Sequence, residues 1–179
     1  MMNSLLNVVW IAIFSVTNFF QKNSLIEWKE GSRLTWDDFK QKPDPGSTNA
    51  ALTGSSIKFN FRYSDNNLEY HVQCLFDKNS SWGRVKTDYI LSHEQGHFDI
   101  TEIYARKLNK ALKEYVIKNP DNLSKDLNRI YQNEMKELNE FQNKYDKETN
   151  FSINKNEQSE WLVKISSELK ELEGFADYR

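Results

Sequence analysis

Cysteine, proline and glycine are scarce in this chain of 179 residues, and neither sign of charge dominates. A single cysteine, Cys74, excludes an intramolecular disulfide. The formal net charge is only −2, so no basic surface for nucleic acid is expected. None of the three prolines falls between Asp88 and Lys118, which leaves room for one long helix. Aromatic residues make up 13 % of the chain, enough to build a packed core.

One long apolar run is present, from Leu5 to Phe20. Its centre, roughly Leu5 to Phe14, has the length of a signal-peptide core and is short for a membrane span. No Lys or Arg precedes it, and no clear small-x-small cleavage site follows it. We expect residues 1–20 to be an export signal or an N-terminal anchor, with a buried N-terminal helix as the alternative. The single domain, residues 21–179, is then secreted, periplasmic or in the cell envelope, and touches membrane only through an uncleaved N-terminal segment.

Period-two alternation predicts a β-hairpin in the first half of the domain. Apolar and polar residues alternate on both sides of Asp65-Asn66-Asn67, which supplies turn chemistry. The alternation indicates an antiparallel pair with one buried face. Cys74 falls on that face and should be a buried thiol, whereas His71 falls on the polar face and should meet solvent. The apolar face carries Ile57, Phe59, Phe61, Tyr63, Leu68, Tyr70, Val72, Cys74 and Phe76.

Shorter elements flank the hairpin. Ile26–Lys29 is predicted to be a short strand. Leu34–Phe39 is predicted to be a helical turn, with Thr35 as its cap and Asp38 in the capping-box position. Lys78–Lys86 is expected to be a loop.

Three amphipathic helices are predicted in the second half: Asp88 to about Lys118, Leu123–Tyr145 and Asn156–Glu173. Asn119-Pro120-Asp121 separates the first two helices and makes them antiparallel neighbours. The predicted fold class is therefore α+β, with an antiparallel hairpin or small sheet packed on a helical half.

The first of these helices contains an H-E-x-x-H motif, in which His93 and His97 are four residues apart. That spacing puts both imidazoles on one helix face, where they can bind one Zn²⁺ at roughly 2 Å. Glu94 lies about 100° around the helix and can reach a metal-bound water as a general base. Two of the chain's three histidines are in this motif, so histidine is not scattered at random.

The third metal ligand must come from elsewhere in the chain. If every residue on either side of Pro120 adds the same rise along its helix, Lys147 lies level with His93 and Asn143 lies level with His97. The end of the second helix therefore lies beside the motif.

Two carboxylates, Asp146 and Glu148, lie at that helix end. Glu102 follows the motif but points to the far side of a continuous helix. We expect Asp146 to be the ligand, with Glu148 next and Glu102 least favoured. Tyr145 is either core or a second electrophile. Gly96 either lets another backbone approach the metal face or is a tolerated flaw.

Three segments resemble the DUF922 family, a family of unknown function whose members are taken to be secreted bacterial zinc-dependent proteases. They are RLTWDDFKQKPDP, KTDYILSHEQGHFDITEIYARKL and YDKETNFSINKNEQSEW. The resemblance covers most of the chain after the apolar run and implies a zinc peptidase. Many relatives carry a histidine after the Tyr-Asp pair, in a pattern like YDxxTxHG, where this chain has Phe151. The departure favours Asp146, which belongs to the shared pair.

The sequence thus predicts an exported, gluzincin-like zinc metallopeptidase. One Zn²⁺ per chain would be held by His93, His97 and Asp146, with Glu94 as the general base. The expected partner is a peptide or protein substrate, including those of the cell envelope, and the hairpin edge offers strand addition to it. The alternatives are a non-catalytic envelope protein, with a structural zinc or no metal, and a hydrolase of cell-wall peptides.

Overall fold

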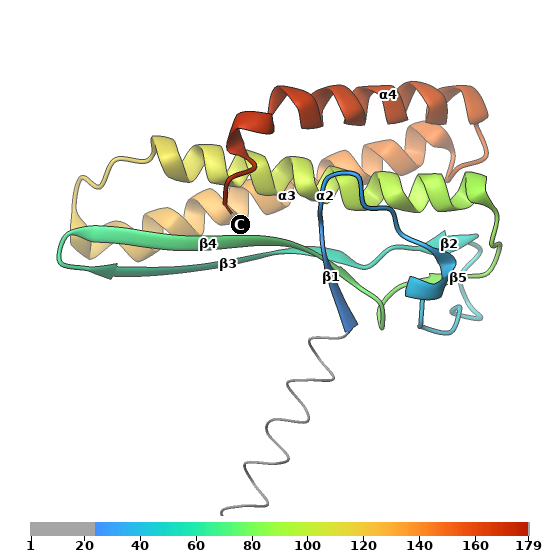
Figure 1. Cartoon of the computed structure of the whole chain (residues 1–179), viewed down its shortest axis with the longest axis horizontal. Helices are drawn as coiled ribbons and strands as arrows, with labels where there is room; N and C mark the ends of the chain where they lie inside the picture. The colour runs from blue at the N-terminus through green and yellow to red at the C-terminus, as the bar shows by residue number, and fades with distance from the viewer. Residues whose placement is uncertain (1–23, 179) are drawn as a thin grey trace, which may run out of the picture.

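The computed structural model describes residues 24–178 and has the predicted α+β architecture (Figure 1). The predicted export segment, residues 1–20, lies outside the described residues. Across the described part of the chain, none of the helices combines the length and the apolar character needed to cross a bilayer. The strands are β1 (Leu25–Glu27), β2 (Ala51–Leu52), β3 (Ser55–Ser64), β4 (Asn67–Asp77) and β5 (Trp82–Gly83), and the main helices are α2 (Asp88–Glu114), α3 (Leu123–Thr149) and α4 (Lys155–Glu171).

The predicted hairpin is confirmed and forms most of a three-stranded antiparallel sheet with the order β1-β4-β3. Its turn has two central residues, Asp65 and Asn66, with φ of 52° and 59°. Left-handed angles at both positions are what a type I′ turn requires, and Asx residues tolerate them. Asn67, expected in the turn, instead pairs with Ser64 as the first residue of β4.

The helices cover only part of the apolar face of the hairpin. Ile57, Cys74 and Phe76 are buried, while Phe61 near the tip is 37 % exposed. The buried Cys74 and the exposed His71 agree with the sequence prediction. The core therefore lies between the near half of the hairpin and the helices.

Helix α2 runs along the β3–β4 hairpin, and α3 returns antiparallel to it, with α4 packed over both (Figure 1). The Thr87 side chain caps α2 by accepting a hydrogen bond from the backbone N–H of Ile90 at 3.2 Å. The helix ends at Glu114, so the predicted end at Lys118 was wrong. Tyr115 takes an extended conformation, which lets its hydroxyl donate to Asp126 on α3 at 2.9 Å. The helix end thus depends on a contact that local sequence does not encode.

The flanking segments are mostly as predicted. β1 pairs with β4, and the turn Trp36–Asp38 is held by the Thr35 N–H, which donates to the Asp38 carboxylate at 2.9 Å. The predicted loop Lys78–Lys86 was wrong in one respect, because it contains β5, which pairs with β2. A pairing of two residues is too short to leave a periodic signal, yet it fixes β2 beside the motif helix.

Candidate metal centre

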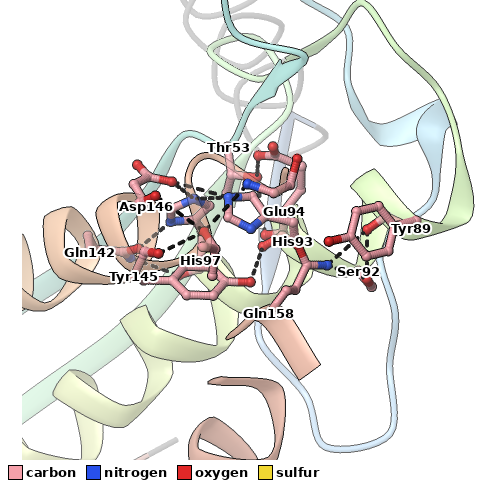
Figure 2. Close-up of polar contacts among 12 residues, drawn as sticks. Thr53, Tyr89, Ser92, His93, Glu94, His97, Gln142, Tyr145, Asp146 and Gln158 are labelled. Atoms are coloured by element: carbon pink, nitrogen blue, oxygen red, sulfur yellow. Dashed lines mark hydrogen bonds and ion pairs between the residues drawn. The ribbon is translucent and has the colours of Figure 1, made fainter. Parts of the chain in front are cut away.

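The two histidines of the motif meet Asp146 in the space between α2 and α3 (Figure 2). The Nε2 atoms of His93 and His97 lie 3.2 Å apart. Asp146 Oδ1 lies 3.1 Å from the first and 3.0 Å from the second. Donors held about 2.0–2.1 Å from one tetrahedral ion stand about 3.3 Å from each other. The three atoms form a triangle of nearly that size.

The helical register differs by one residue from the count made through Pro120. Asp146 contacts both histidines, where the count placed Lys147 level with His93. The segment joining the helices contains a 3₁₀ turn, Pro120–Asn122. Residues 115–119 before it are not helical, and a 3₁₀ turn rises about 2.0 Å per residue against 1.5 Å in an α-helix, so an equal-rise count drifts over the whole connection.

The other two candidate carboxylates lie away from this triangle. Glu148 accepts a hydrogen bond from Trp161 Nε1 at 2.9 Å, on the side of α4. Glu102 is fully buried on the far side of α2, where it accepts from Arg106 Nε at 2.8 Å and from the Tyr178 hydroxyl. Of the three acids considered, the structure brings Asp146 alone to the histidines.

Gln142 fixes the orientation of the second histidine. Its Oε1 contacts His97 Nδ1, and its Nε2 donates to the His97 carbonyl at 2.9 Å and to Thr101 Oγ1 at 3.3 Å. With the amide so placed, Oε1 accepts the Nδ1 proton, which leaves the Nε2 lone pair facing the triangle. Sequence reasoning missed Gln142, although it stands four residues before Asp146 and so shares its helix face.

Tyr145 packs the inner side of the site. Its ring stacks on the His93 ring with centroids 4.5 Å apart, and its hydroxyl donates to the His93 carbonyl at 3.3 Å. Burial raises the pKa of Tyr145. A Cβ at Gly96 would lie 2.6 Å from the Tyr145 hydroxyl oxygen. Gly96 therefore makes room for this side chain rather than for a backbone, and Tyr145 is a core residue rather than a second electrophile.

Glu94 lies beside the triangle with its carboxylate held by Thr53 (Figure 2). The Thr53 hydroxyl donates to Glu94 Oε2 at 2.7 Å. Burial raises the pKa of Glu94, and the charge of His97 and the Thr53 hydrogen bond offset part of that effect. A raised pKa suits a carboxylate that must pick up a proton near neutral pH. No sequence pattern marked Thr53, which β2 delivers to the site.

The charges of the triangle fit a bound cation. Burial alone would raise the pKa of Asp146, but hydrogen bonds to His93 and His97 hold it well below its usual range. Burial alone would lower the pKa of His97, but Asp146 and Glu94 raise it. The site therefore favours one positive charge among its donors, which either a proton or a metal ion supplies.

The triangle opens into a cleft of about 280 Å³, whose wall includes Leu52, Thr53, Ser55, Leu138, Asn139 and Phe151. A larger cavity of about 730 Å³ lies on the other side of α2 and contains none of the three donors. We therefore take the smaller cleft as the candidate site. Its rim includes Phe151, whose phenyl ring supplies no metal ligand.

A profile of the family described as "Bacterial protein of unknown function (DUF922)" matches residues 31–152. That span contains the hairpin, α2, α3 and every residue of the site described above. No curated protein matches the chain, and no solved structure matches it either.

Proposed function

The chain belongs to the DUF922 family of bacterial proteins, and we propose that it is a zinc-dependent metallopeptidase. The observation that supports this most is the convergence of three donor atoms beside a buried carboxylate, at an open cleft. His93, His97 and Asp146 would hold one Zn²⁺ per chain. When bound, such an ion supplies a Lewis acid and lowers the pKa of a water ligand to about 7.

The chain's own groups then have separate tasks. Glu94 takes the proton of the attacking water and delivers it to the leaving amine. Thr53 keeps the Glu94 carboxylate pointed along the cleft through their 2.7 Å hydrogen bond. Gln142 holds His97 in the tautomer that presents Nε2.

The open cleft favours catalysis over a structural zinc. Structural zinc sites usually take four protein ligands, whereas catalytic sites take three and leave one position free. Among residues 24–178, the histidine, cysteine and acidic donors that converge here number three. Export to the cell envelope or beyond, which residues 1–20 predict, is part of this proposal.

The test combines metal analysis with a cleavage assay on fluorescein-labelled casein, an unfolded polypeptide. We expect one zinc per chain, and Glu94→Gln should lower the cleavage rate by about 10²–10⁴-fold. Zinc content and melting temperature should stay the same, because no donor of the triangle is changed. Glu140→Gln, at an exposed position on α3, is the matched control. Absence of zinc after reconstitution contradicts the proposal, and so does full activity in Glu94→Gln.

A further inference from the structure

Strand β3 lies at the edge of its sheet, and in the described part of the chain no strand pairs with its outer side. Ser64 and Asn67 flank a two-residue turn and form a hydrogen-bonded pair, so the even-numbered residues of β3 bond to β4. The odd-numbered residues, including Phe59 and Phe61, direct their N–H and C=O groups outward. The hydroxyl of Tyr131 donates to the carbonyl of Ile57 at 3.0 Å, which agrees with this assignment and already uses one of the two acceptor positions of that carbonyl.

Helix α3 forms a second wall along this edge. Asn128 and Tyr131 line an outer hollow with β3 residues between Ser56 and Phe61. Leu138 and Gln142 line the metal cleft with Ser55 at the start of β3. These α3 residues share one helix face. The β3 residues in the two walls, Ser55 and Ser56, are consecutive, and we call the hollow and the cleft together the groove.

The outer hollow is aromatic. The ring of Phe59 stacks on Tyr131 with centroids 5.9 Å apart, and on Phe61 with centroids 5.8 Å apart. Phe61 remains 37 % exposed at the end of this stack. An apolar side chain placed here would gain contact with three rings.

We propose that the groove binds an extended peptide substrate as an additional antiparallel strand on β3, anchored by an apolar side chain against Phe59, Phe61 and Tyr131. This inference rests on the proposed peptidase function and names its substrate class. Phe59 and Phe61 lie four and six residues beyond Ser55, about 13–20 Å at a strand rise of about 3.3 Å per residue. The anchor is therefore about four to six residues from the scissile bond. β3 runs away from the cleft, so an antiparallel peptide runs toward it, and the anchor is N-terminal to that bond.

Charge favours a peptide over a second copy of this chain. The solvent face of β3 carries exposed Lys58 and Arg62 on either side of Asn60. Two copies paired about Asn60 would place Lys58 of one opposite Arg62 of the other, and opposed like charges destabilise a strand pair. A peptide with acidic residues at alternate positions meets both cations instead.

The first test measures binding to the full chain after zinc removal. The probe is a fluorescein-labelled decapeptide that alternates Phe and Glu. Residues opposite Phe59 and Phe61 in the added strand would share their face and send N–H groups toward β3. N-methylation of the probe's phenylalanines should therefore weaken binding at least tenfold, whereas N-methylation of its glutamates should not.

The second test changes the protein. Phe61→Lys should weaken binding of the unmodified probe at least tenfold, and Val163→Lys, at a 71 % exposed position on α4, should not. Phe61→Thr keeps strand propensity and should reproduce the loss at an unchanged melting temperature. Equal binding in Phe61→Lys, or equal binding of the two N-methylated probes, overturns the inference. So does a concentration-dependent dimer that Phe61→Lys disrupts.

These outcomes are separate from the proposed chemistry. Casein cleavage that is intact in Phe61→Lys overturns the groove and leaves the metallopeptidase standing. Binding that depends on Phe61 in a chain that takes up no zinc supports the groove and overturns the metallopeptidase.

Discussion

Helix α2 carries two buried polar clusters on opposite faces, and they differ in how their charges are satisfied. The rear cluster contains Gln95, Asp99, Glu102 and Arg106. Asp99 accepts from Trp28 Nε1 at 2.7 Å and from Gln95 at 2.8 Å. Each acid of this cluster thus faces donors that the chain itself provides.

The front cluster is arranged in the opposite way. His93, His97 and Asp146 turn three acceptor-type atoms toward one another, and His93 Nδ1 is buried without a hydrogen-bond partner. Because lone pairs turned toward one another repel unless a cation lies between them, the three atoms of the triangle ask for a proton or an outside ion. The contacts of the rear face therefore stabilise the fold, whereas the front face leaves three donor atoms for the ion proposed above.

The largest effect is expected from a substitution that disrupts the rear cluster. Glu102→Ala leaves the buried guanidinium of Arg106 without its 2.8 Å partner. Removal of one member of a buried ion pair costs about 3–5 kcal/mol, so the free energy of unfolding should fall by that much. Urea denaturation measures it, and zinc affinity should not change.

A matched control uses a pair on the surface. Glu140 lies 3.8 Å from Lys136 on α3, and both side chains are exposed. Glu140→Ala should cost less than about 0.5 kcal/mol. If Glu102→Ala cost no more than this, the rear cluster would not be the stabilising one.

The second effect concerns the packing behind the front cluster. Gly96→Ala gains about 1 kcal/mol of helix propensity but pushes a methyl group against the buried ring of Tyr145. Overpacking a filled core costs about 1–3 kcal/mol, so the variant should be less stable and should bind zinc more weakly through a displaced His93. Thermal unfolding and zinc titration measure both effects. Gly174→Ala, which has no atom within 4 Å of its added Cβ, should lose nothing.

The third effect concerns how Gln142 orients the His97 ring in the front cluster. Gln142→Leu removes the acceptor at His97 Nδ1, so zinc affinity should fall by about 10–100-fold. Gln142→Glu keeps an acceptor and should retain most of the affinity. Chelator competition measures the affinity. Equal zinc affinity in Gln142→Leu would show that the triangle needs no such support.

Sequence periodicity predicted the elements whose contacts are local. The alternation through β3 and β4 predicted the hairpin, and the unbroken run after Thr87 predicted α2. The end of α2 could not be predicted, because it depends on Tyr115 reaching Asp126 on another helix. The β2–β5 pair could not be predicted either. Each of these strands has only two residues, and tertiary contacts alone hold them together.

The candidate site also contains residues that sequence spacing can identify and residues that it cannot. Spacing identified His93, Glu94 and His97, and the count through Pro120 together with the shared Tyr-Asp pair brought in Asp146. Thr53 stands 41 residues from Glu94 and arrives through β2, so no local pattern could show it.

The smallest effect is a difference in pH dependence between one acid from each cluster. In the zinc-free protein, the stabilisation that the two acids provide should change in opposite directions with pH. Hydrogen bonds to the histidines hold the pKa of Asp146 below the unfolded value of about 3.9. Its stabilisation is therefore present above pH 4 and lost as the pH falls toward the native pKa. Burial raises the pKa of Asp99 despite its bonds to Trp28 and Gln95. The contribution of Asp99 to the free energy of unfolding is therefore full at low pH, and it falls as the pH rises through the native pKa.

Urea denaturation between pH 5 and pH 3, below the range in which His97 titrates, would therefore separate the two acids. The cost of Asp146→Asn should shrink as the pH is lowered, while the cost of Asp99→Asn should grow. Neither slope can exceed about 1.4 kcal/mol per pH unit, because each variant removes one titrating proton. Slopes of the same sign would mean that the two faces of α2 do not differ as their contacts indicate, since only the front acid is held below its unfolded pKa by hydrogen bonds from histidines.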